Sequence, residues 1–253
     1  MSKIKTYAQI NKIRAAGKIL AKVLREVSNT AREEITLKDL DDLARELILK
    51  AGARPAFLGY RPAGASKPYP SSICASVNEV VVHGVPTDRR LRQGDILKLD
   101  LGVNLDGWNA DCAITLGIGN IGNTAKDLIM TAKDALEAAI AVSKAGNSLG
   151  DIGWAIQSIT KKRGFKIIKG LAGHGIGERV HEEPSVFNEG LPGKGEKLKS
   201  GMVLAIEPMI SIGSDQIVQL EDDSYKTADS SLSAHFEHTI VITDDGCEIL
   251  TVL

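Results

Sequence analysis

Two helix-start signals, separated by 112 residues, constrain most strongly what this chain can fold into. Segments 36–39 (Thr-Leu-Lys-Asp) and 148–151 (Ser-Leu-Gly-Asp) both have the spacing of a capping box, in which a hydroxyl and an acid satisfy backbone N–H groups at the start of a helix. A glycine follows each signal at the same interval, Gly52 or Gly164, and suits a helix end. The pattern predicts two similar halves; the alternative is a chance similarity between two capped helices.

The spacing of hydrophobic residues alternates along the chain between a helical period and a strand period. Helical periods cover about 7–27, 36–51 and the segments that begin at Thr124 and Ser148, whereas strand patterns cover 73–117 and 165–253, with a final hairpin around 244–246. The order helices, strands, helices, strands predicts an α+β protein built in two halves. Because no linker or low-complexity segment divides the sequence, we expect residues 1–253 to form a single domain.

The charge balance and the cysteine count exclude several classes of protein. The formal net charge is -1, so the composition does not favour binding to nucleic acid or to an anionic membrane. The start of the chain lacks the apolar core of a signal peptide, and no apolar run approaches the roughly 18 residues of a membrane span. The three cysteines are widely spaced, which argues against a disulfide framework. We expect a cytoplasmic protein, with a monomer as the simplest state.

Two aspartates in apolar surroundings give the first sign of a functional site. Asp100 and Asp111 flank segment 104–107, Asn-Leu-Asp-Gly, which is a hairpin turn signal. A two-residue turn at 105–106 pairs position 100 with 111, and a turn at 106–107 pairs position 100 with 113. Either turn places both carboxylates on one face of the ribbon. Such a pair repels and loses hydration unless a cation holds it, and hard divalent cations prefer oxygen ligands.

Two glutamates and a histidine have equally unusual surroundings. Glu207 and Glu237 lie in or beside apolar strands that contain no lysine or arginine, although a buried unpaired glutamate is unfavourable. His174 lies among the glycines of segment 170–177, which let the backbone crowd a ligand. With the two aspartates these residues make five candidate metal ligands. A carboxylate-rich set of this kind suits two metal ions about 3.5–4 Å apart, and Mn, Fe, Co and Zn all match its chemistry.

Two further histidines have weaker individual signals. His83 ends an apolar strand before Gly84, and a strand end that opens onto a cleft suits a proton-transfer group. His181 follows His174 by seven residues. Taken singly, each is more often a surface histidine or one with its hydrogen bonds satisfied, so they gain meaning only with the candidate ligands.

Seven segments carry motifs that are specific in combination: 76–86, 99–102, 109–111, 173–177, 181–184, 205–208 and 231–240. Together they resemble the type I methionine aminopeptidases, and the resemblance runs from the first helix to the final hairpin. It implies the pita-bread fold, in which two pseudo-symmetric halves form a curved antiparallel sheet covered by helices. It also implies a hydrolase that removes the initiator methionine from nascent proteins and peptides with two metal ions, preferring a small second residue.

The resemblance implies a role for each candidate ligand. Asp111 and Glu237 bridge the two ions, Asp100 binds one of them through both oxygens, and His174 and Glu207 complete the other. Glu207 is also the group that accepts a proton from the attacking water.

Other positions receive roles by the same resemblance. His83 contacts the substrate N-terminus and assists the leaving amine, and His181 contacts the scissile carbonyl and helps to stabilise the oxyanion. Asn78, Val80 and Ser233 match positions whose oxygens bind a monovalent cation, Na or K.

The resemblance also implies a methionine pocket. Tyr60, Tyr69 and Cys74 match positions that line it together with His83. A thioether packs well against aromatic edges, and its unbranched chain fits a narrow slot.

The pocket is also where the sequence departs from the family pattern. Phe57 stands where a cysteine is often found, and 61–67 resembles a short insertion. Val180 replaces a usual aromatic residue, and segment 213–228 lacks a common tryptophan, with Asp223 near that place. These departures bear on the shape of the pocket and leave the candidate ligands unchanged.

Two rival functions stay open on sequence grounds. An X-Pro aminopeptidase or prolidase shares the fold, although such enzymes usually carry a further N-terminal domain. A non-catalytic binding protein of the same fold is the other alternative, and such relatives typically lose metal ligands. The sequence does not fix the metal or whether the ribosome is a partner beside the peptide substrates.

Overall fold

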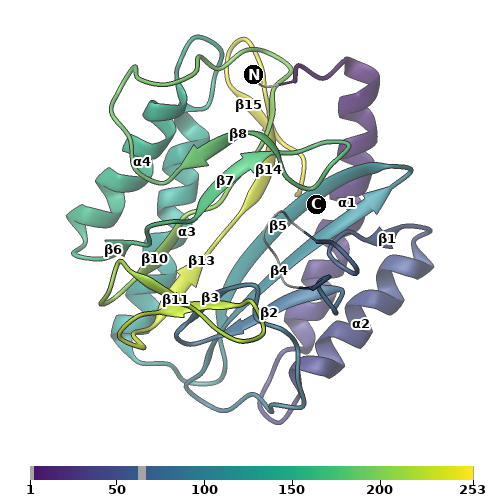
Figure 1. Ribbon diagram of the computed structural model, residues 1–253, viewed down its shortest axis with the longest axis vertical. Helices are drawn as coiled ribbons and strands as arrows, with labels where there is room; N and C mark the ends of the chain where they lie inside the picture. Colours follow the sequence, from purple (N-terminus) through teal and green to yellow (C-terminus); the bar gives the residue numbers. More distant parts are fainter. Residues whose placement is uncertain (1–2, 62–66, 253) are drawn as a thin grey trace.

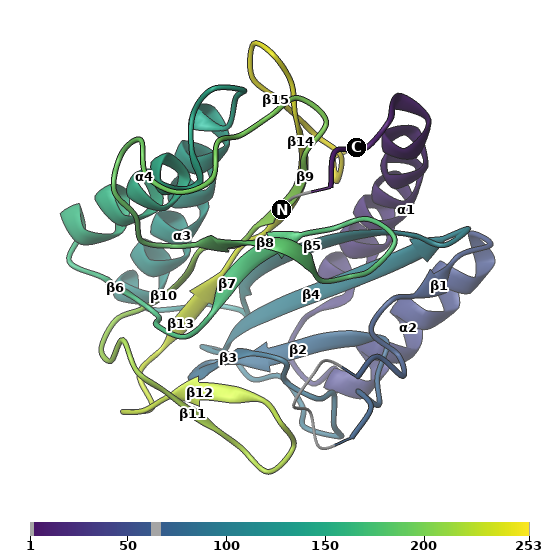
Figure 2. The same ribbon diagram turned by 45° about the horizontal axis from the view of Figure 1, so that its top comes forward.

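A computed structural model describes residues 3–61 and 67–252 as two helix-covered halves with strands between them (Figure 1). Helices α1 and α2 lie on one flank and helices α3 and α4 on the other, and the turned view preserves this arrangement (Figure 2). Within the described residues, no helix is both long and apolar enough to cross a membrane. The order of elements confirms the predicted α+β class.

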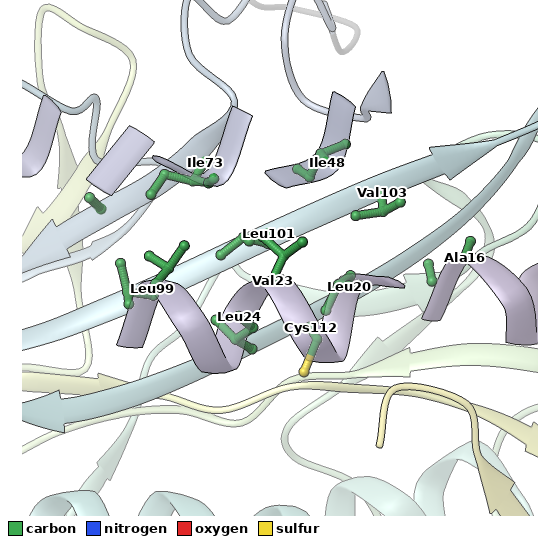
Figure 3. Close-up of a cluster of buried hydrophobic side chains, with 14 of the residues drawn as sticks. Ala16, Leu20, Val23, Leu24, Ile48, Ile73, Leu99, Leu101, Val103 and Cys112 are labelled. Atoms are coloured by element: carbon green, nitrogen blue, oxygen red, sulfur yellow. The ribbon is translucent and has the colours of Figure 1, made fainter. Parts of the chain in front are cut away.

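The first half consists of two helices and a sheet built around one long strand. Its elements are α1 (Tyr7–Thr30), α2 (Leu37–Lys50), β1 (Arg54–Pro55), β2 (Ile73–Val77), β3 (Val80–Val82), β4 (Ile96–Leu105) and β5 (Trp108–Gly117). Strand β4 pairs antiparallel with β1, β2 and β5. Figure 3 shows Leu99, Leu101 and Val103 of β4 gathered with Leu20 and Val23 of α1 in the main hydrophobic core. Alternate residues of β4 are therefore buried under α1, and the residues between them face the other half.

The second half repeats the plan of two helices beside antiparallel strands. Its elements are α3 (Asn123–Val142), α4 (Leu149–Lys162), β6 (Lys166–Ile167), β7 (Ala172–Gly175), β8 (Glu182–Phe187), β9 (Val203–Ile206), β10 (Met209–Ser211), β11 (Ile217–Gln219), β12 (Tyr225–Thr227), β13 (Ser233–His235), β14 (His238–Ile242) and β15 (Cys247–Ile249). One sheet has the order β15-β14-β9-β7-β8, β10 pairs with β13 and β6, and β12 pairs with β11 and β3. A second core lies between α3, α4 and the larger sheet.

The two capping boxes form as the sequence predicts. Thr36 and Asp39 exchange side-chain to backbone hydrogen bonds of 3.0 Å in both directions at the start of α2. Ser148 and Asp151 form the second capping box at the start of α4. Helix α3 differs from the prediction, because it begins one residue before Thr124 and its N-cap is Gly122, with no side-chain cap.

The hairpin between β4 and β5 resolves the two turns that the sequence left open. Its central residues are Asp106 (φ 49) and Gly107 (φ 84), and both have the positive φ of a type I′ turn. Asp100 therefore pairs with Ala113, and Asp111 lies diagonal to Asp100 on the same face.

Strand β5 also connects the two halves of the molecule. The backbone N–H of Glu237, between β13 and β14, donates to the Ala113 oxygen at 2.8 Å. The Thr239 hydroxyl accepts from the Asp111 backbone N–H at 2.9 Å and donates to the Asp111 oxygen at 2.8 Å. These contacts place a carboxylate of each half side by side.

The core of the first half offers a test of the packing. Leu101 is fully buried on β4, so Leu101→Ala should lower the free energy of unfolding by about 2–5 kcal/mol through lost burial and a residual cavity. Urea denaturation measures this change. The control is Leu191→Ala, because Leu191 is 63% exposed and its loss should change stability by less than about 0.5 kcal/mol. Equal effects of the two substitutions would contradict the assigned core.

Candidate metal centre

Three side chains from different parts of the chain meet between the two halves. Asp111 on β5, His174 on β7 and Glu237 between β13 and β14 bring ligand atoms within 4.8 Å of one another. All three are buried. His174 is held in place because β7 pairs with both β8 and β9, and the contact between Glu237 and β5 fixes the carboxylate beside Asp111.

The other two candidate ligands adjoin this group. Asp100 is half-buried on β4, and its carboxyl interacts directly with that of Asp111. Glu207 follows β9 directly, and its Oε1 is 3.6 Å from Nε2 of His174. The five residues predicted as ligands thus form one cluster, to which both halves contribute.

Four carboxyl groups in one buried cluster disfavour their own ionisation. Burial raises the pKa of Asp100 to about 6 and that of Glu207 to about 8. Burial and the adjacent Asp100 raise the pKa of Asp111 well above its usual range, and burial and Asp111 do the same for Glu237. Like charges and exclusion of water both act against the anionic state. A protein without a cation here would carry this unfavourable energy in its folded state.

The donor atoms of the cluster fit divalent cations. Oδ1 of Asp100 and Oε1 of Glu237 are buried and find no hydrogen-bond partner among the described residues. Buried polar atoms are normally satisfied, so such atoms call for a ligand. Burial, with a smaller contribution from His181, lowers the pKa of His174 to about 3, which keeps its imidazole in the neutral form that binds metals. Carboxylate oxygens with one imidazole suit Mn, Fe, Co or Zn.

Two more histidines face the same cavity. The ring of His181 lies 4.4 Å from that of His174, edge to face, and its Nδ1 is 2.8 Å from the Tyr60 hydroxyl. His83 follows β3 with a φ of 60 and packs edge to face on Tyr225. Burial lowers the pKa of both His83 and His181 to about 4, so both are neutral near pH 7.

A cavity of about 310 Å³ connects these groups to a less polar compartment. All five candidate ligands line it, and so do both candidate histidines. The predicted pocket residues Tyr60, Tyr69 and Cys74 lie on its wall, together with Leu171 and Met209, which the sequence did not single out. The cavity therefore joins a cluster of metal-binding groups to a compartment with apolar walls.

Two residues noted in the sequence as departures lie together beside this wall. Phe57 and Val180 are both buried and pack in one cluster with Cys74, and Phe57 lines the cavity. Asp222 and Asp223 line the cavity in the segment that lacks a tryptophan. The predicted insertion 61–67 falls largely outside the described residues.

His235 is a residue of this site whose place the sequence left open. It is 1% exposed, and its Nε2 is 3.3 Å from Oε2 of Glu207. Burial lowers its pKa to about 4. Its position two residues before Glu237 places both side chains on one face, and this spacing was the available signal. His238 instead contacts the Thr251 hydroxyl, at 2.9 Å, away from the cluster.

The oxygens predicted to bind a monovalent cation also lie together. The Ser233 hydroxyl is 3.2 Å from the Asn78 oxygen and 3.4 Å from the Val80 oxygen. The ammonium group of Lys98 lies at the same place and donates to the Asn78 oxygen at 2.6 Å.

Comparisons with known proteins agree with this geometry. The model of Metallopeptidase family M24 matches residues 11–244. The chain is 42% identical over 251 residues to a methionine aminopeptidase of Clostridium perfringens (strain 13 / Type A), which covers 99% of this chain and 98% of that protein. A crystal structure of methionine aminopeptidase from Rickettsia prowazekii superposes with a TM-score of 0.95 at 40% identity and covers 100% of both chains. A prolidase from Pyrococcus furiosus is similar in fold alone, with a TM-score of 0.80, 24% identity, and coverage of 99% of this chain and 65% of the prolidase. These neighbours confirm the predicted pita-bread fold.

Proposed function

This chain belongs to metallopeptidase family M24, and we propose that it removes the N-terminal methionine from peptides and nascent proteins by metal-dependent hydrolysis. The observation that carries the proposal is the shared cavity, in which a cluster of buried carboxylates and an imidazole adjoins a compartment with apolar walls. Relatives that match over nearly the full length of this chain carry the same activity in their names.

Two divalent cations are the proposed cofactors. Asp100, Asp111, His174, Glu207 and Glu237 would hold them, because all five side chains line the same cavity. When bound, such ions polarise a carbonyl and lower the pKa of water toward ~7. We propose that two ions bind and that they are Mn, Fe, Co or Zn.

The protein groups around the ions have separate tasks. Glu207 is the proposed acceptor of the proton from the attacking water, because its carboxyl lies beside His174 and lines the cavity. His181 donates a hydrogen bond toward the scissile carbonyl, and the Tyr60 hydroxyl at its Nδ1 orients the ring. His83, which lines the same cavity, contacts the substrate N-terminus and the leaving amine.

The pocket accounts for the choice of methionine. Tyr69 donates from its hydroxyl to the backbone oxygens of Ile73 and Gly84, both at 3.0 Å, so its ring is fixed in the wall. Cys74 and Met209 supply soft, apolar surface, which suits an unbranched thioether. We further propose a small second residue in the substrate, a single domain, a monomer in the cytoplasm and contact with nascent chains at the ribosome.

The test is turnover by the metal-free protein titrated with Mn, Fe, Co and Zn. We expect release of methionine from Met-Ala-Ser with kcat/KM at least about tenfold higher than release of leucine from Leu-Ala-Ser, because a narrow slot disfavours a branched side chain. Activity should saturate at two ions per chain. Preferred cleavage of Xaa-Pro peptides would favour the prolidase-type alternative. Metal binding without turnover of any peptide would favour a binding protein.

A further inference from the structure

Lys98 is a buried lysine whose ammonium group is surrounded by neutral oxygens. The residue is 1% exposed. Its Nζ donates to the Asn78 backbone oxygen at 2.6 Å, to the Ser233 backbone oxygen at 3.2 Å and to the Ser233 hydroxyl oxygen at 3.3 Å. Because an ammonium group has three protons, these acceptors can engage each of them.

The acceptor oxygens come from two segments that converge on β4. Asn78 lies in the turn between β2 and β3 with a φ of 53. Its backbone N–H donates to the Ile96 oxygen at 2.9 Å, and its side-chain amide donates to Asp95 at 2.8 Å, so the residue is held beside the start of β4. Ser233 begins β13 in the other half, and its hydroxyl lies within 3.4 Å of the Val80 oxygen. The fold therefore builds a small group of oxygens and directs the Lys98 ammonium into it.

We infer that the Lys98 ammonium group replaces the monovalent cation expected at Asn78, Val80 and Ser233. Backbone oxygens bind a monovalent ion by replacing its hydration shell, and an ammonium group uses the same lone pairs. A free ion would have to displace Lys98 from these lone pairs. The tethered group also loses less translational freedom than a free ion on reaching this place. The chain thus carries its own cation here and does not depend on Na or K at this position.

The contacts of Lys98 are those expected of an ammonium group. Three acceptors favour the protonated form, because a neutral amine would turn its lone pair toward one of them. The contacts tie β4, which carries Asp100, to the segment that leads to Glu237. The inference concerns stability and ion binding, so it stands apart from the proposed function.

Thermal unfolding in different salts tests the inference. The wild-type protein should show the same midpoint, within about 1 °C, in KCl, NaCl and tetramethylammonium chloride at one constant ionic strength, since no bound ion is exchanged. Lys98→Ala should lower the midpoint by roughly 6–15 °C in tetramethylammonium chloride, because it leaves buried oxygens without a donor. KCl or NaCl at about 200 mM should recover at least roughly 3 °C of this loss in the variant alone.

Lys98→Met is the matched control. It fills the same space with an apolar chain, so it should be destabilised and should not respond to K or Na. A wild-type midpoint that falls when tetramethylammonium replaces K and Na would overturn the inference. A Lys98→Ala protein with the same midpoint in all three salts would also overturn it. If Lys98→Ala does not fold, crystals of the wild-type protein soaked in rubidium decide the question: anomalous density at the Asn78 and Ser233 oxygens refutes the inference, and a lysine ammonium there supports it.

Discussion

Replacement of Glu207 with glutamine is expected to lower kcat by about 10²–10⁴-fold, the usual contribution of a general base. The amide keeps the volume of the side chain but cannot accept a proton. The Nε2 atoms of His174 and His235 lie 3.6 Å and 3.3 Å from the two carboxyl oxygens of Glu207, and a glutamine of the same shape can keep both contacts. The single-turnover rate with Met-Ala-Ser, measured at saturating metal, reports on the chemical step.

The fold should survive this substitution. Burial raises the pKa of Glu207 to about 8, so in the metal-free protein its carboxyl is largely protonated near pH 7, and a neutral glutamine of the same volume removes only the cost of burying an ionisable group. The metal-free variant should therefore unfold at a temperature no lower than the metal-free wild type. Glu189→Gln is the control, because Glu189 forms an exposed pair with Lys161 whose loss should leave kcat nearly unchanged. Near-normal turnover by the Glu207 variant would show that another group accepts the proton.

Local signals explain why much of the fold could be predicted from the sequence. A capping box involves residues three positions apart, so Thr36 and Ser148 reveal the starts of α2 and α4 without any tertiary information. The N-cap of α3 was harder to locate because Gly122 makes no side-chain bond that a sequence pattern could reveal. The turn after β4 stayed ambiguous because both candidate turns use Asp106, and the structure selects the one in which Gly107 also has positive φ.

The candidate ligands were visible for a different reason. An acid within an apolar strand is conspicuous in any sequence, and Asp100, Asp111, Glu207 and Glu237 all have such surroundings. The hairpin turn signal placed Asp100 and Asp111 on one face, whereas the convergence of the other candidate ligands with them is a long-range property for which the roles came from the resemblance.

The partner of Lys98 could not be inferred from its neighbours in sequence. Lys98 lies on β4, but the oxygens that accept its hydrogen bonds belong to Asn78 and Ser233. A lysine in an apolar strand can face solvent or a buried acceptor, and only the packing of two distant segments decides between them. His235 presents the same difficulty, because its closeness to Glu207 depends on how β13 lies beside the end of β9.

Asp111→Asn should have opposite effects on stability with and without metal. In the metal-free protein the substitution removes a carboxyl group whose pKa is raised well above its usual range by burial and by the adjacent Asp100, so the cost of burying this group disappears and the midpoint of unfolding should rise or stay level. Saturating metal should raise the midpoint of unfolding of the wild type by more than it raises that of the variant. A neutral amide would replace a carboxylate of the proposed ligand set, and we expect metal affinity to fall by at least about 100-fold, which corresponds to about 2.7 kcal/mol of lost stabilisation.

The Asp111→Asn substitution should remove a metal ligand without disrupting the hairpin. The Oδ1 atom of Asp111 accepts from the Cys112 backbone N–H at 3.0 Å, and the amide oxygen of an asparagine can keep this bond, so the strand should persist. Asp106→Asn is the matched control, because Asp106 is exposed in the turn of the same hairpin and asparagine tolerates its positive φ. Calorimetric titration and metal content after dialysis should show two ions in the control and fewer than two in the Asp111 variant. Two ions bound by the Asp111 variant with unchanged affinity would mean that Asp111 is not a metal ligand, because the loss of a ligating carboxylate should weaken binding.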